Sequence, residues 1–244
     1  MIHKTKGIVL RTIKYGETSA VVNIFTELFG IQSYLVNGIH TPVKVYSKAS
    51  LFQPASILEM EVYHNELKNL QRIKEFKWSY LYKNILTDIT RNSVAIYMIE
   101  LLQKCLKQPE NNAALFDFCE TSFIQLDGAE EAVMANFPLY FSLHVIRFFG
   151  FNIRNNYSKE KSVLDLQEGI FTDIVPRHSH FLDEDYSQCI SRLLKVKAAD
   201  ELSQIKLNKA SRREMLLALQ SFYALHIQDF GMMKTLPVLH EILS

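Results

Sequence analysis

The chain has 244 residues, of which 48% are hydrophobic and 22% are charged, and its formal net charge at pH 7 is +1. This composition excludes a disordered or fibrous protein, and the sequence has no run of 18 apolar residues of the kind that spans a membrane. The N-terminus lacks the apolar core of a signal peptide, and the three widely spaced cysteines fit reduced thiols. We therefore expect a cytoplasmic protein.

Alternating and β-branched residues in the first 76 positions predict five short strands. We expect these strands at about residues 4–13, 20–27, 31–36, 51–63 and 70–76. Gly16 and Gly30 lie in the first two turns, where glycine permits a left-handed backbone. A polar segment at residues 40–48 predicts an exposed loop between the third and fourth strands. This arrangement predicts a small closed barrel of the OB type.

Aromatic residues of this barrel have two possible roles. Single-stranded nucleic acid binds by stacking its bases on aromatic side chains beside a basic groove. For Phe29, Tyr34 and Phe52 we favour a place in the barrel core instead. For Tyr46, in the polar loop, base stacking and a structural role are equally open.

From Trp78 onward, apolar residues recur every three to four positions, which predicts helices. The positions expected to be buried include Val94, Tyr97, Leu101, Cys105, Leu115, Cys119, Phe137 and Phe141. Pro138 is expected in the first turn of its helix, where proline is tolerated. Ser211 and Glu214 have the spacing of a capping box and predict a helix start there.

These elements predict an α+β protein with two domains. We expect an OB-fold barrel at residues 1–78 and a mostly helical domain at residues 79–244. Within the second domain, residues 152–182 lack a clear period and predict an irregular segment.

Positive charge is concentrated near the N-terminus. Residues 1–80 contain ten Lys or Arg and six Glu, so the remainder of the chain carries a net negative charge. A basic face favours a polyanionic partner, and a solvated barrel exterior is the alternative. The candidate nucleic-acid contacts are Lys4, Lys6, Arg11, Lys14, Lys44, Tyr46 and Lys48.

A second basic cluster comprises Lys209, Arg212 and Arg213, near the start of a predicted helix. Cations at that end oppose the helix dipole, so the cluster favours an anionic partner. An ordinary solvated helix end is the alternative interpretation.

Residue patterns typical of catalysis are absent from the sequence. It has no glycine-rich phosphate loop, no H-E-x-x-H and no G-x-S-x-G, so we predict no enzymatic activity. His178 and His180 form the one close histidine pair, and a surface loop is favoured over a metal site. His144 and His226 lie on apolar stripes and are expected to be buried and hydrogen-bonded.

Several short motifs resemble the bacterial RecO family of DNA repair and recombination mediators. They are Gly7-Ile8-Val9-Leu10, Tyr15-Gly16-Glu17-Thr18-Ser19, Phe25-Thr26, Gly30, Asn37-Gly38 and Leu51-Phe52-Gln53-Pro54. Asn136-Phe137-Pro138, Phe149-Gly150-Phe151 and Leu236-Pro237-Val238-Leu239-His240 resemble RecO proteins of the Bacteroidetes. The resemblance covers essentially the whole chain.

The resemblance implies an OB-fold followed by a helical domain that together bind single- and double-stranded DNA. It also implies work with RecR and with the C-terminal tail of single-stranded DNA-binding protein (SSB). The implied role is to anneal complementary strands and to help load RecA onto SSB-coated DNA, without covalent chemistry. The second basic cluster would then contact DNA or the SSB tail.

In one respect the chain departs from the family pattern. Many RecO proteins carry a four-cysteine zinc module, whereas residues 152–182 contain no cysteine, so we predict no zinc site. Phe171 and Phe181 are expected to hold this segment by packing. The competing function is a helical protein–protein adaptor whose β-barrel binds a peptide and not nucleic acid.

Overall fold

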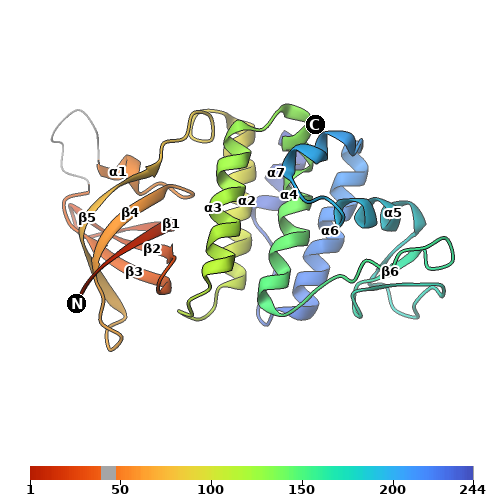
Figure 1. Ribbon diagram of the computed structural model, residues 1–244, viewed down its shortest axis with the longest axis horizontal. Coiled ribbons are helices and arrows are strands. Elements are labelled where there is room, and N and C mark those ends of the chain that lie inside the picture. The colour runs from red at the N-terminus through yellow and green to blue at the C-terminus, as the bar shows by residue number, and fades with distance from the viewer. Residues whose placement is uncertain (40–47, 244) are drawn as a thin grey trace. The chain divides into compact units, whose positions relative to one another are not determined.

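The computed structural model describes residues 1–39 and 48–243 (Figure 1). The chain forms two compact units. Met1–Lys83 and Leu106–Ile124 make up the first, called the barrel unit here. Asn84–Cys105 and Gln125–Ser244 make up the second, called the helical unit.

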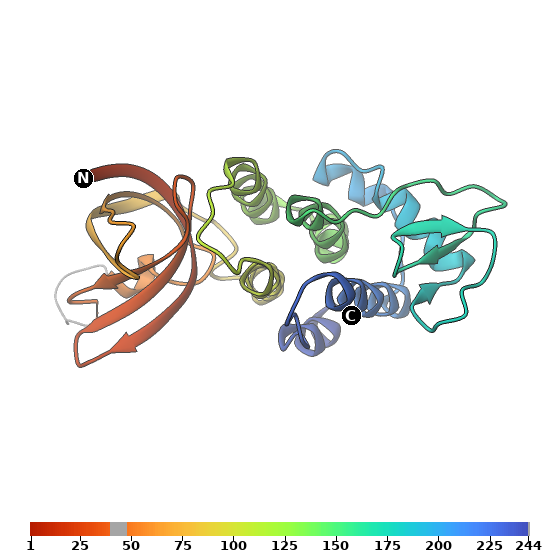
Figure 2. The ribbon, with the colours of Figure 1, turned by 90° about the horizontal axis from the view of Figure 1, so that it is seen from below.

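The barrel unit contains a closed five-stranded sheet, which confirms the predicted OB-type fold. Its strands are β1 (Ile2–Tyr15), β2 (Ser19–Thr26), β3 (Gly30–Val36), β4 (Ile57–Tyr63) and β5 (Leu70–Tyr80). They close in the order β1-β2-β3-β5-β4, with β3 parallel to β5 and the other pairs antiparallel. Figure 2 shows these strands curving around a common centre. Closure gives each of these strands a paired neighbour on both sides.

The barrel encloses a dense apolar core. Its buried side chains include Val9, Val22, Ile24, Tyr34, Phe52, Leu58, Met60 and Val62. The prediction for Tyr34 and Phe52 is thereby confirmed, and Phe29 is partly buried against the same cluster. Gly7 belongs to this packing, since a Cβ atom there would lie 2.5 Å from Ile24 Cγ2 and 2.6 Å from Met60 Cε.

A β-bulge in β1 decides which side chains face out of the barrel. Val9 pairs with Ile24, and Arg11 pairs with the next residue, Asn23, so Leu10 is the extra residue. Thr12 faces inward and donates a hydrogen bond of 2.6 Å to the carbonyl oxygen of Phe52. The bulge therefore turns Arg11 to the outside.

Two predicted boundaries in this unit are wrong. Residues 51–56 do not extend β4, because α1 (Lys48–Leu51) and a turn with Ala55 at φ 72° occupy this stretch. Trp78 does not begin a helix but lies in β5, where it pairs with Leu58. Cross-strand pairing here outweighs the apparent helical spacing of the apolar residues.

Residues 106–124 add a helical layer to the barrel unit. They include most of α3 (Ala113–Gly128), whose Phe116 ring lies 5.6 Å from the ring of Phe25 on β2. The predicted stripe is confirmed, because Leu115 and Cys119 are buried. The helix thus covers the outer side of β2 at Phe25.

The helical unit surrounds a second core. Its helices are α2 (Ile89–Cys105), α4 (Glu131–Val145), α5 (Glu184–Leu193), α6 (Lys209–His226) and α7 (Thr235–Ile242), with 3-10 turns at Ile146–Phe149 and Ala199–Gln204. Tyr97 on α2 and Tyr223 on α6 both hydrogen-bond to Ser142 of α4, at 2.8 and 2.7 Å. The predicted stripe at Val94, Tyr97, Leu101 and Cys105 is buried, as expected.

Two predicted helix starts in this unit are wrong. Pro138 lies inside α4, which already begins at Glu131, so it is not in the first turn. The capping box at Ser211 does not form, because the Asn208 side chain caps α6 by accepting a bond of 2.7 Å from the Ser211 N–H. Asn is as good an N-cap as Ser, so the helix begins one turn earlier.

Helix α4 and the 3-10 turn after it form an unusually apolar segment. Residues Glu131–Phe149 are long and apolar enough to cross a membrane, with a mean hydropathy of 1.2. Because 67% of this stretch is buried inside the protein, it fits the core helix of a folded domain.

The segment at 152–182 forms a small antiparallel sheet of β6 (Val163–Asp165), β7 (Ile170–Thr172) and β8 (Phe181–Leu182). The side-chain amide of Asn156 donates a hydrogen bond of 2.8 Å to the carbonyl oxygen of Phe171 and accepts one of 2.9 Å from the Phe171 N–H. Phe171 is buried, as predicted, and Phe181 is half-buried. In the described part of the chain, no three His, Cys, Asp or Glu side chains are grouped to hold a metal ion.

The predicted histidine pair lies in this segment. His178 Nε2 is 3.4 Å from a carboxylate oxygen of Asp165, and the rings of His178 and His180 are 6.1 Å apart. Asp165 is already engaged, because it accepts hydrogen bonds from the N–H groups of Gln167 and Glu168. The pair therefore contributes to the structure of the loop.

Candidate nucleic-acid interface

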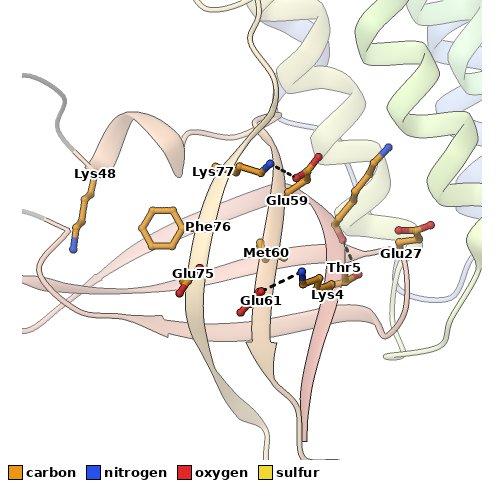
Figure 3. A pocket seen from close by; sticks show the side chains of 11 residues that line it. Lys4, Thr5, Glu27, Lys48, Glu59, Met60, Glu61, Glu75, Phe76 and Lys77 are labelled. Carbon is orange, nitrogen blue, oxygen red and sulfur yellow. Dashed lines mark hydrogen bonds and ion pairs between the residues drawn. The ribbon is translucent and has the colours of Figure 1, made fainter.

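Three of the predicted lysines line one hollow on the barrel (Figure 3). Lys4, Lys6 and Lys48 share it with Lys77 and with four acidic side chains, Glu27, Glu59, Glu61 and Glu75. Positive and negative charges in the hollow are therefore equal in number. A phosphate entering here would meet carboxylates as often as ammonium groups.

Most of these lysines are engaged in ion pairs. Lys6 Nζ lies 2.9 Å from Glu120 on α3, and this hydrogen bond raises the pKa of Lys6. Lys4 Nζ lies 3.5 Å from a carboxylate oxygen of Glu61. Figure 3 marks this ion pair with a dashed line. Exposed pairs of this kind are weak, so the Lys4 contact leaves its ammonium group available to solvent. Lys6 is held more firmly, because the Glu120 side chain is only 15% exposed.

Arg11 and Lys14 differ from these lysines. Both are exposed near the end of β1, and neither forms a side-chain hydrogen bond or ion pair with any residue that the structure describes. Their charges are therefore free to attract an anion.

The sheet register places Arg11 on a continuous outer face. Directly paired residues point to the same side of a sheet, so the side chains of Arg11, Asn23, Ser33 and Leu70 form one row across β1, β2, β3 and β5. The adjoining row contains Ile13, Val21, Leu35 and Arg72. We call these two rows the outer face.

The outer face combines cations with exposed apolar side chains. Ile13 is 43% exposed and Leu70 is 40% exposed, and Arg72 is exposed at the β5 end of the row that contains Ile13. In OB-folds, nucleic acid is bound over strands 2 and 3 and between the loops that flank them. Cations on such a face provide contacts to phosphates.

Arg72 contributes to the basic excess of residues 1–80 but was not predicted as a nucleic-acid contact. Arg72 is far from Arg11 in sequence, and the parallel pairing of Leu35 with Arg72 places it in the row adjoining that of Arg11. Lys44 and Tyr46 fall outside the described residues. Lys48 is exposed at the start of α1.

The second predicted cluster is also brought together. Lys209, Arg212 and Arg213 line a small hollow with Leu216, Leu239, His240 and Leu243, between α6 and α7. Arg212 is half-buried and donates to the carbonyl oxygen of Leu207 at 2.7 Å, and burial lowers its pKa. Arg212 therefore supports the structure, while Lys209 and Arg213 are exposed.

A closed OB barrel with an exposed cationic face is typical of nucleic-acid-binding proteins. Residues 1–82 match the family Recombination protein O N terminal, and residues 86–158 match Recombination protein O C terminal. The chain therefore belongs to the RecO family of DNA repair proteins, which confirms the resemblance seen in its motifs.

Similar proteins cover the whole chain. The DNA repair protein RecO of Phocaeicola vulgatus is 32% identical over 244 residues, which is 100% of both chains. The proteins of the same name from Flavobacterium johnsoniae and Christiangramia forsetii are 32% and 33% identical, over 99% of each chain.

Proposed function

We propose that this protein is a non-catalytic recombination mediator that binds single- and double-stranded DNA through the outer face of its barrel. The observation that carries this proposal is the pair Arg11 and Arg72, exposed and without ion pairs among the described residues, on the OB face of a RecO-family chain. Contacts to phosphates carry no sequence information, so binding is largely independent of sequence.

The same electrostatics support strand annealing. Two DNA strands repel one another because both are negatively charged. A cationic surface that accepts both single strands and duplex lowers this repulsion while the strands find their complementary bases. In this role the protein acts in the cytoplasm together with RecR and helps load RecA onto SSB-coated single strands. It carries out this role without a zinc ion.

The cations beside the hollow between α6 and α7 suit a contact with the SSB tail. Lys209 and Arg213 are exposed there and can attract an acidic peptide. Charge reversal at Lys209 and Arg213, with SSB-tail peptide and DNA titrated separately, tests which partner binds there. Unchanged affinity for both would remove the cluster from the binding surface.

Fluorescence anisotropy with labelled oligonucleotides tests the central proposal. If about four phosphates are neutralised, log K falls with log salt with a slope near −3 for single strands. Arg11→Ala and Arg72→Ala each remove one cation and reduce the slope by about 0.7. Lys195→Ala, at an exposed lysine of the helical unit, is the matched control.

The same experiment separates DNA binding from the adaptor function. Salt-independent affinity, or an unchanged slope in both arginine variants, would contradict phosphate binding by the outer face. No binding to DNA at low salt would leave a peptide-binding adaptor as the better explanation.

A further inference from the structure

A polar hollow adjoins the outer face of the barrel. It has a volume of about 510 Å³ and is lined from β2, β3, the β4–β5 loop and the segment before α3. Asn23 and Ser33 belong both to this hollow and to the row that contains Arg11. A DNA strand on the outer face would therefore pass its rim.

The hollow presents unused hydrogen-bonding groups. Asn23 accepts a bond of 3.0 Å from Ser33 Oγ, which leaves its amide N–H groups without a partner among the described residues. Gln32 donates a hydrogen bond of 2.9 Å to the carbonyl oxygen of Phe29. Its side-chain oxygen has no partner among the described residues. Asn69 and Asn111 are exposed, and neither side chain is bonded to a residue that the structure describes.

The loop on one side of the hollow is held in place. Gln71 is buried, accepts a hydrogen bond of 3.0 Å from the Asn65 N–H and donates one of 2.9 Å to the Asn65 carbonyl oxygen. These bonds fix the β4–β5 turn that carries Asn69. A fixed loop loses less conformational entropy when a ligand binds.

One wall of the hollow is aromatic. The Phe29 and His64 rings are stacked with centroids 3.9 Å apart, and the His3 ring meets Phe29 edge-on at 5.2 Å. Lys68 and Glu66 are the charged side chains among the residues that line the hollow, so the two charges balance. A phosphate would need more cations, whereas neutral amides beside an aromatic wall suit a planar, uncharged, polar group.

We propose that this hollow binds one unpaired nucleobase of a DNA strand whose phosphates lie on the outer face. Its amides would hydrogen-bond the base edge, which is free in a single strand and occupied by pairing in a duplex. The inference depends on the proposed function, since the strand must first be held by Arg11 and Arg72. It adds a contact that favours single strands over duplex.

Three labelled DNAs of equal length test this inference: a single strand, a single strand with abasic residues in its central half, and a duplex. The variant Asn69→Ala/Asn111→Ala removes two exposed amides that support no other group among the described residues. Loss of two hydrogen bonds is expected to weaken binding of the normal single strand about tenfold. Affinity for the abasic strand and for the duplex is expected to stay unchanged.

Asn23→Ala is a second variant with the same expected pattern, and Gln53→Ala, at an exposed amide of the barrel that does not line the hollow, is the control. Unchanged affinity for the normal strand in both test variants, or equal loss on the abasic strand, would overturn the inference. Arg11→Ala tests the proposed function separately, because it is expected to weaken binding of all three DNAs.

Discussion

Gly30, the first residue of β3, lies so close to the main chain of Glu110 that no side chain fits between them. A Cβ atom on Gly30 would lie 2.7 Å from the carbonyl carbon and 2.9 Å from the nitrogen of Glu110. The φ angle of Gly30 is +62°, in the left-handed region that favours glycine. Both residues belong to the barrel unit, so the start of β3 positions the segment that leads into α3.

Gly30→Ala is therefore expected to destabilise the barrel unit by about 2–4 kcal/mol, from the left-handed backbone and from overpacking together. Gly16→Ala is the matched control, because Gly16 has φ +69° but no atom within 4 Å of a Cβ at that position. It is expected to cost about 1–2 kcal/mol. Urea unfolding followed by Trp78 fluorescence measures both, and equal losses would show that the Glu110 contact carries no energy.

The barrel could be predicted from sequence because its signals are local. Alternating residues and the glycines at turns define the first three of the five strands closely. The start of β4 was misplaced because Leu51 and Phe52 continue an apolar pattern that the backbone does not follow. The end of β5 was misplaced because Trp78 satisfies both a two-residue and a four-residue period.

Less of the candidate site than of the barrel could be predicted from the sequence. The sequence shows that Lys6 is basic but not that Glu120, 114 residues away, is paired with it. The parallel pairing that joins Arg72 to the face of Arg11 is likewise a long-range feature. The amides around Asn23 carry no sequence motif, and they come from segments far apart in the chain, including the β4–β5 loop and the segment before α3.

The Lys6–Glu120 pair leads to a prediction about DNA binding. Lys6→Ala is expected to weaken DNA binding less than Arg11→Ala, because the Lys6 ammonium group is already neutralised by a carboxylate. Glu120→Gln keeps the shape of the partner, releases this charge, and is expected to tighten binding a few-fold at low salt. Anisotropy titrations measure both variants. A loss in Lys6→Ala as large as that in Arg11→Ala would show that Lys6 leaves Glu120 to bind phosphate.

The cap of α6 can be tested by a pair of substitutions one turn apart. Asn208→Ala removes the side-chain oxygen that accepts the Ser211 N–H and is expected to cost about 1 kcal/mol of stability. Ser211→Ala is expected to cost less than about 0.5 kcal/mol, since the Ser211 hydroxyl bonds to no residue that the structure describes. Urea unfolding followed by far-UV circular dichroism measures both. A larger loss of stability in Ser211→Ala than in Asn208→Ala would show that Ser211, and not Asn208, caps the helix.

His144 makes the helical unit sensitive to acid. Burial, with a smaller contribution from the charge of Arg147, lowers the pKa of His144 from 6.5 to about 4. Its Nε2 is buried with no hydrogen-bond partner among the described residues, so protonation leaves a poorly solvated charge. The unfolded chain binds this proton more readily than the folded chain does. The free energy of unfolding therefore falls as the pH drops from about 6.5 to about 4, by at most about 3 kcal/mol.

His144→Phe keeps a ring at this position, in contact with Tyr140, and removes the titrating group. The variant is expected to lose less stability than the unchanged protein between pH 7 and pH 4, although other groups titrate in both. Urea unfolding at pH 7, 5.5 and 4, followed by far-UV circular dichroism, gives the difference between the two proteins at each pH. If that difference stays constant across the three values, His144 does not titrate differently in the folded and unfolded chains.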